Sequence, residues 1–168
     1  MHTRRTLLGI IGMLGVMLPS IGYAAEDPKV ESAMTLLKSD AAKMGPPKIE
    51  GTDPVAGKPV PAIYFGGTKM NNNFNVVDDV VKQAGGTATI FVKSGDEFVR
   101  VATNVKKDDG SRAIGTVLDP NGKAIAAIRN GQAFYGDVDI LGKPYVTGYE
   151  PIWDGAKVIG IYYVGYQK

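Results

Sequence analysis

Two neighbouring segments carry the clearest β-strand signal of the sequence: Thr87–Val92 (TATIFV) and Glu97–Thr103 (EFVRVAT). Both are rich in β-branched and aromatic residues, which favour a pleated, half-buried strand. The four residues between them, KSGD, are polar and include a glycine, as a tight turn requires. Because a parallel pair needs a crossover of about a dozen residues or more, this spacing predicts an antiparallel hairpin.

Toward the C-terminus the same pattern continues. Residues 123–130 predict one short helix, which follows a turn at Asp119-Pro120-Asn121-Gly122. Apolar runs separated by short segments with glycine or proline predict further strands at 112–118, 134–140, 144–152 and 158–166. Connections this short again favour antiparallel pairing.

Toward the N-terminus, apolar residues recur at helical spacing in two segments. Asp27 and Pro28 predict a helix start, because aspartate accepts a free backbone N–H and proline suits the first turn. This helix is expected to end before Gly45, and a second helix is predicted at 74–84.

The remaining N-terminal residues complete the predicted architecture. Residues 45–61 are rich in proline and glycine and lack periodicity, which indicates an extended surface crossing before a short strand at 62–65. The element order predicts an α+β fold, with a five- or six-stranded antiparallel sheet, an N-terminal helix and helices packed on one side. We divide the chain into a leader at 1–24, the helix and crossing at 25–61, and a main domain at 62–168.

The leader has the pattern of a secretory signal peptide. Arg4 and Arg5 give it a positive start, Leu7–Leu18 is apolar, and small residues precede a cleavage point after Ala24. A retained membrane anchor is the alternative, although a spanning helix needs about 20 apolar residues. The arginine pair also fits twin-arginine export. We therefore expect an exported, periplasmic protein.

The composition excludes several kinds of chemistry. The chain has no cysteine, and its single histidine, His2, lies in the predicted leader. A mature protein without these residues has no Cys or His nucleophile, no His-based triad and none of the usual zinc, copper or haem ligands. Two of the 19 basic residues leave with the leader, and the other 17 balance 17 acidic residues, so nothing points to nucleic acid. We expect no enzymatic activity and no cofactor.

From Met70 onward, several segments carry a resemblance to a known family. They are Asn71–Phe74 with Val77-Asp78, Gly85–Phe91, Phe98–Val105, Asp109–Thr116, Gly131, Tyr135-Gly136, Leu141–Tyr145, Tyr149–Pro151 and Gly160–Tyr166. In this order they resemble the single Cache domain of the type 3/type 2 fusion class, an extracytoplasmic sensing domain of bacterial chemoreceptors.

The resemblance implies a PAS-like antiparallel sheet whose concave side, covered by helices and loops, holds one small molecule. Relatives mostly bind small metabolites, short carboxylates among them. In receptors the domain lies between two membrane helices and precedes a signalling module, whereas we expect this chain to be a stand-alone exported copy. It would then need a membrane-bound sensor kinase, chemoreceptor or transporter as its partner.

Arg100 is the first candidate for holding a ligand. It lies mid-strand between valines, and alternation places it on the face shared by Phe98 and Ala102. A guanidinium among apolar neighbours suits a buried carboxylate, which it can bind through two parallel hydrogen bonds. A structural pair with Asp96, Glu97 or another acid at the sheet surface is equally compatible with the sequence.

Arg112 is the second candidate. It follows a charged loop and begins an apolar run. It also lies within the segments that carry the family resemblance. The alternative is a structural ion pair with a nearby acid such as Asp108 or Asp109.

Aromatic residues of a later strand are candidates for the pocket wall. Tyr145, Thr147 and Tyr149 alternate and therefore share one face, and Tyr135 is expected to join them from the neighbouring strand. A tyrosine offers an apolar surface and one hydroxyl, as a small-ligand pocket requires. The alternative is that they are half-buried sheet residues with their hydroxyls in water.

Two functions remain open from the sequence. The first is a periplasmic module that binds a small organic anion such as a short carboxylate and feeds a signal transduction or chemotaxis partner. The second is a structural or protein-interaction module whose pocket is filled by side chains. An open pocket with unpaired arginine donors favours the first, and bulky residues in the pocket favour the second.

Overall fold

A computed structural model describes residues 27–168, so the predicted leader at 1–24 lies outside the described residues. The elements in chain order are α1 (Pro28–Met44), β1 (Pro47–Val55), β2 (Lys58–Phe65), β3 (Thr68–Lys69), α2 (Asn75–Ala84), β4 (Thr87–Ser94), β5 (Glu97–Thr103), α3 (Lys123–Arg129), β6 (Phe134–Ile140), β7 (Lys143–Asp154) and β8 (Lys157–Gln167).

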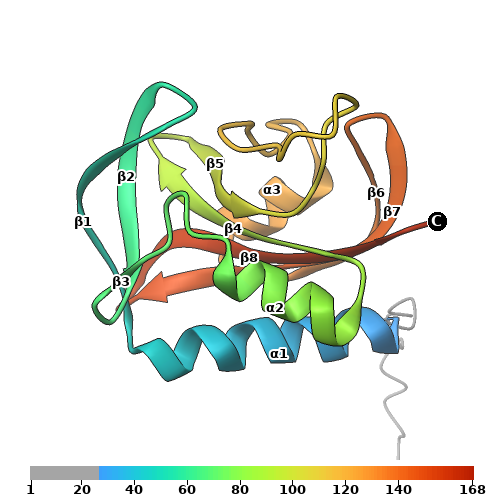
Figure 1. Cartoon of the computed structure of the whole chain (residues 1–168), viewed down its shortest axis with the longest axis horizontal. Helices are drawn as coiled ribbons and strands as arrows, with labels where there is room; N and C mark the ends of the chain where they lie inside the picture. The colour runs from blue at the N-terminus through green and yellow to red at the C-terminus, as the bar shows by residue number, and fades with distance from the viewer. Residues whose placement is uncertain (1–26) are drawn as a thin grey trace, which may run out of the picture.

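Five strands form one antiparallel sheet in the order β5-β4-β8-β7-β6 (Figure 1). The predicted hairpin of β4 and β5 is confirmed, with Ser94 paired to Glu97 beside its turn. The strands predicted at 134–140, 144–152 and 158–166 are confirmed as β6, β7 and β8. The chain therefore has the α+β architecture that the element order predicts and the PAS-like sheet that the family resemblance implies.

The helices lie on both faces of this sheet. Helices α1 and α2 pack side by side on one face, and α3 covers the opposite face (Figure 1). The first two helices lie on one side as predicted, but α3 does not. Its side chains Ala124, Ile125 and Ile128 join a separate core cluster with Phe91 and Tyr163, and this cluster surrounds the candidate site.

Helix α1 begins where its capping residues predict. The Asp27 side chain accepts a hydrogen bond from the backbone N–H of Lys29 at 2.9 Å, and Pro28 occupies the first turn. One stripe of the helix is buried against the sheet, formed by Val30, Ala33, Met34, Leu37 and Ala41.

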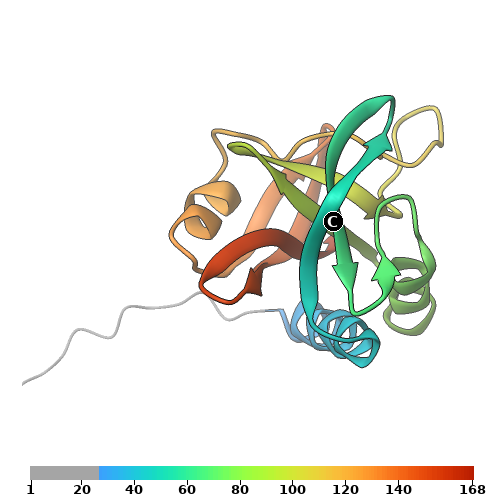
Figure 2. The ribbon, with the colours of Figure 1, turned by 90° about the vertical axis from the view of Figure 1, so that its left-hand side faces the viewer.

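Residues 45–61, predicted as an extended surface crossing, instead contain regular strands. Strands β1 and β2 form an antiparallel hairpin that, with β3, makes a second, three-stranded sheet at one end of the main sheet (Figure 2). Most of β1 is exposed, so it lacks the alternation that marks a half-buried strand. Its prolines are tolerated because β1 is an edge strand.

Residues 112–118 do not form the predicted strand but still lie along β5. Backbone hydrogen bonds of 2.9 Å run from Gly115 N to Arg100 O, from Arg100 N to Thr116 O and from Leu118 N to Phe98 O. The segment therefore covers the outer edge of β5 and forms one side of the candidate site.

Candidate functional site

Arg100 lies in β5 on the sheet face that α3 covers. A register shift against β4 inserts Val101 as an extra residue, which makes a β-bulge. The bulge returns Ala102 to the face under α1 and α2, while Phe98 belongs to the cluster near α3. The predicted common face of Arg100 and Phe98 is therefore confirmed, and that of Arg100 and Ala102 is wrong.

The Arg100 guanidinium has few partners for a buried charge. Nη1 donates to Thr116 Oγ1 at 2.8 Å and makes a longer contact of 3.5 Å with Val117 O. The guanidinium carbon lies 4.9 Å from the centre of the Phe91 ring. Nε is buried and has no hydrogen-bond partner, and no carboxylate within residues 27–168 forms a salt bridge with this arginine.

This uncompensated charge is energetically costly. Arg100 is only 4% exposed, and burial lowers its pKa, partly offset by the nearby Tyr149 and Tyr163 hydroxyls. An arginine nevertheless stays protonated in a protein. Because buried charges in proteins are normally paired or hydrogen-bonded, the free Nε–H marks a place where an anion would be stabilised.

A cavity of about 400 Å³ lies beside Arg100. Two buried side chains bring polar groups to it, Arg100 and Tyr149. The remaining lining residues come from the 117–124 segment, β6 and the β6–β7 turn: Val117, Leu118, Asp119, Gly122, Lys123, Ala124, Asp137, Val138, Asp139, Ile140 and Leu141. Its size suits a small organic molecule.

Tyr149 supplies a hydroxyl and an aromatic wall. Its ring lies 4.9 Å from that of Tyr163 and 6.2 Å from that of Phe134. Burial raises the pKa of Tyr149, against the opposing effect of Arg100, so the hydroxyl is neutral and able to donate. Within residues 27–168 it makes no hydrogen bond, so it can bind a ligand oxygen without breaking an existing contact.

Tyr145 and Thr147 share the face of Tyr149, as the alternation predicts. Tyr145 is buried in the core cluster near α3 and does not line the cavity. The Thr147 hydroxyl donates to Gly136 O at 2.7 Å and so ties β7 to β6. These two residues support the site but do not border its cavity.

The expectation that Tyr135 joins this group is wrong. Tyr135 pairs with Gly148 across the β6–β7 ladder and therefore lies on the α1 face. Its hydroxyl donates to Glu150 Oε1 at 2.6 Å, and Lys38 of α1 pairs with the same carboxylate. Phe134, one residue earlier, is the β6 side chain that contacts Tyr149.

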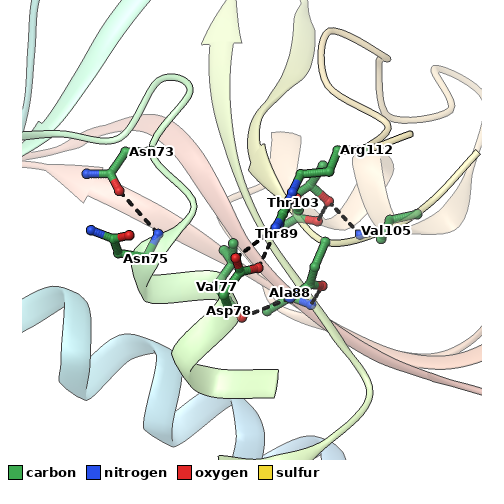
Figure 3. Close-up of polar contacts among 10 residues, drawn as sticks. Asn73, Asn75, Val77, Asp78, Ala88, Thr89, Thr103, Val105 and Arg112 are labelled. Carbon is green, nitrogen blue, oxygen red and sulfur yellow. Dashed lines mark hydrogen bonds and ion pairs between the residues drawn. The ribbon is translucent and has the colours of Figure 1, made fainter. Parts of the chain in front are cut away.

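Arg112 is held in a structural ion pair, the alternative that the sequence left open. Both terminal nitrogens donate to the Asp78 carboxylate on α2 at 2.7 Å, and Nη1 also donates to Thr103 O at 2.9 Å (Figure 3). Its guanidinium lies 4.4 Å from the centre of the Phe74 ring. The hydrogen bonds from Arg112 lower the pKa of Asp78. The partner is thus Asp78 rather than Asp108 or Asp109, and the pair lies outside the cavity beside Arg100.

Sequence reasoning missed most of the apolar cavity wall. The signal was present in β6, where Phe134, Val138 and Ile140 alternate with Asp137 and Asp139. Such alternation predicts one apolar face and one exposed face. The contribution of 117–124 carried no comparable local signal, because this segment reaches the site only by tertiary folding.

A larger hollow of about 760 Å³ lies along the outer edge of β6. It is lined by residues from both ends of the described chain, including Asp27 and Lys168, and by Tyr135 and Thr147. No buried, unpaired polar atom of residues 27–168 faces it, since the only such atom in that range is Arg100 Nε. The smaller cavity is therefore the candidate site.

Within residues 27–168, no three carboxylate, His or Cys side chains lie close enough together to hold a metal ion. In the same range, no helix has the length and apolar character needed to cross a bilayer.

The structure is thus a PAS-like α+β domain with a cavity of about 400 Å³ beside a buried arginine. The sequence profile of the Cache 3/Cache 2 fusion domain matches residues 21–168, and the chain belongs to this family. The match includes α1 and the β1–β2 hairpin as well as the main sheet. Cache domains are extracytoplasmic sensory domains and are generally not enzymes. Comparison with curated proteins gave no match.

Proposed function

We propose that this Cache domain binds a small organic anion, in the first instance a carboxylate, in the cavity beside Arg100. The observation that carries the proposal is the buried guanidinium, whose Nε–H has no partner and whose charge has no counterion in the described chain. A bound carboxylate would supply both, because its two oxygens match the planar donors of arginine.

Tyr149 gives the site a second donor. Its neutral hydroxyl lines the same cavity and is not engaged elsewhere in residues 27–168. Hydrogen bonds to a charged group contribute about 1.5–3 kcal/mol each, so two or three of them account for selective binding of a small anion.

The open cavity also favours the first of the two functions that the sequence allowed. A structural or protein-interaction module was expected to have its pocket filled by bulky side chains. The cavity of about 400 Å³ beside Arg100 is open instead, which supports a ligand-binding module. Small-molecule pockets commonly use a small number of polar groups to fix the orientation of the ligand.

In this proposal, the leader exports the chain to the periplasm, where the ligand-bound form engages a membrane-bound sensor kinase, chemoreceptor or transporter. The sensory role of the family supports such a partner. We expect helix α1 to contact this partner. The ion pair between Lys38 and Glu150 connects the helix to β7 at the residue that follows Tyr149.

The test is thermal unfolding of the purified protein with a panel of carboxylates and their uncharged amides. Ligand at 100 times its Kd adds about 2.7 kcal/mol. The unfolding entropy of a domain this size is about 0.3 kcal/mol/K, so the melting temperature should rise by about 9 °C.

Two variants serve as a matched pair in this test. Arg100→Met should abolish the shift, whereas Arg112→Met should retain it, because Arg112 is paired with Asp78 outside the cavity. A shift that survives Arg100→Met, or equal shifts from the amides, would contradict the proposal. So would a broad panel of anions that leaves the melting temperature unchanged.

A further inference from the structure

We infer, on the basis of the proposed function, that the ligand is a monocarboxylate with a branched aliphatic or aromatic body rather than a di- or tricarboxylate. The carboxylate would lie at Arg100, and the apolar body would occupy the outer part of the cavity. Three features of the cavity support this inference: its apolar walls, the presence of Leu141 in a turn that disfavours leucine, and the charges around its rim.

The walls between Arg100 and solvent are largely apolar. Leu118 lies on the side of the 117–124 segment, and Val138 and Ile140 lie on the side of β6. Of the four large hydrophobic side chains that are exposed within residues 27–168, two line this cavity: Val117 at 40% and Leu141 at 45%. A ligand with an apolar body would remove both from water, whereas a fully polar ligand would leave them exposed.

Leu141 occupies a position where local structure disfavours it. It is the first residue of the two-residue turn between β6 and β7, in which Leu141 has φ of 52° and Gly142 has φ of 81°. Turns of this kind favour Asn, Asp or Gly at that position, and a bulky residue there is strained. Strain that persists beside a cavity points to a role in the site.

The charges around the rim disfavour a second carboxylate. Asp119, Asp137, Asp139 and Lys123 line the outer part of the cavity, and Asp137 is paired with Lys168. One lysine therefore faces two aspartates. Their carboxylates are fixed in turns, with Asp119 accepting from Asn121 N at 3.0 Å and Asp139 from Gly142 N at 2.8 Å. A second anionic group near them would be repelled.

The first experiment compares two ligands that have nearly the same shape. Succinate and 4-methylpentanoate differ in that a carboxylate replaces an isopropyl group, and both are titrated into the purified protein by calorimetry. We expect 4-methylpentanoate to bind at least about tenfold more tightly, with binding lost in Arg100→Met. Tighter or equal binding of succinate that requires Arg100 would overturn the inference and leave the proposed function intact. Failure of every anion to bind would overturn both.

The second experiment separates the turn from the ligand contact. Leu141→Asn places a favoured residue in the turn, so it should raise the melting temperature of the free protein while weakening 4-methylpentanoate binding about tenfold or more. Acetate, which has no apolar body to reach the turn, should bind the variant and the unmodified protein alike. Ile49→Asn is the control, because Ile49 is another large hydrophobic residue exposed to solvent (38%) and does not line the cavity. It should leave binding unchanged. Unchanged 4-methylpentanoate binding in Leu141→Asn would contradict the inference.

Discussion

Replacing Arg100 by methionine tests whether this residue serves the ligand or the fold. Methionine has a similar length and no charge, so it fills much of the same space against Phe91. Thr116 keeps a partner in the variant, because its hydroxyl donates to Ala113 O at 2.7 Å. The substitution therefore removes the charge without leaving another buried polar group unsatisfied.

The expected change in stability is a difference between opposing contributions. The variant loses one charge-assisted hydrogen bond, about 1.5–3 kcal/mol, and a stack on Phe91 of up to about 2 kcal/mol. It also removes the desolvation penalty of an unpaired buried ion, which is several kcal/mol. We therefore expect the free energy of unfolding of the ligand-free protein to stay within about 1 kcal/mol of its original value.

The assay is urea unfolding at pH 7 in a buffer without carboxylates. Arg112→Met is the matched comparison, and it should lose about 1 kcal/mol or more, because it breaks the pair with Asp78 and the hydrogen bond to Thr103 O. A loss of about 3 kcal/mol or more in Arg100→Met would refute the reasoning, since that is the cost of breaking a buried, compensated charge pair.

Three further predictions follow from individual contacts. Tyr149→Phe should weaken carboxylate binding about tenfold, measured by calorimetry, with little effect on folding, because its hydroxyl has no partner in the described chain; a large loss of stability would indicate a structural role instead. Arg112 lowers the pKa of Asp78, so the stabilisation is full above about pH 4 and is lost as the pH falls through the lower folded-state pKa. Asp78→Asn should thus be less stable than the unmodified protein at pH 7, and their urea midpoints should converge once the pH falls below that folded-state pKa; a difference independent of pH would count against this pair. Asp27→Ala should cost about 1 kcal/mol by removing the cap of α1, and Asp27→Asn should recover most of it in the same urea assay.

Elements whose structure depends on nearby residues were predicted correctly from the sequence. The β4–β5 hairpin and α1 were correct because turn residues, capping residues and periodicity lie within the segments themselves. Strand β1 was missed because an exposed edge strand with prolines lacks alternation. Helix α3 was found, but its side of the sheet depends on packing that no local pattern records.

The site was predictable only in part, because its assembly depends on register and long-range pairing. Arg100 and Tyr149 were identified from strand alternation, and both line the cavity. Tyr135 was placed on the wrong face, because its partner across the ladder is Gly148 rather than Tyr149, and a one-residue difference reverses the face. Arg112 pairs with Asp78 on α2, which is 34 residues away in the sequence, and no local spacing indicates such a pair.

Whether Arg100 holds the anion can be tested by an NMR measurement on the Arg100 Nε–H group itself. Its ¹H–¹⁵N resonance is identified by its absence in Arg100→Met, and the purified protein is titrated with the carboxylate that gives the largest rise in melting temperature. We predict that this resonance moves downfield as the ligand saturates, because an unpaired N–H gains a carboxylate acceptor. A resonance that stays unchanged while the ligand binds stoichiometrically would contradict the claim that Arg100 holds the anion.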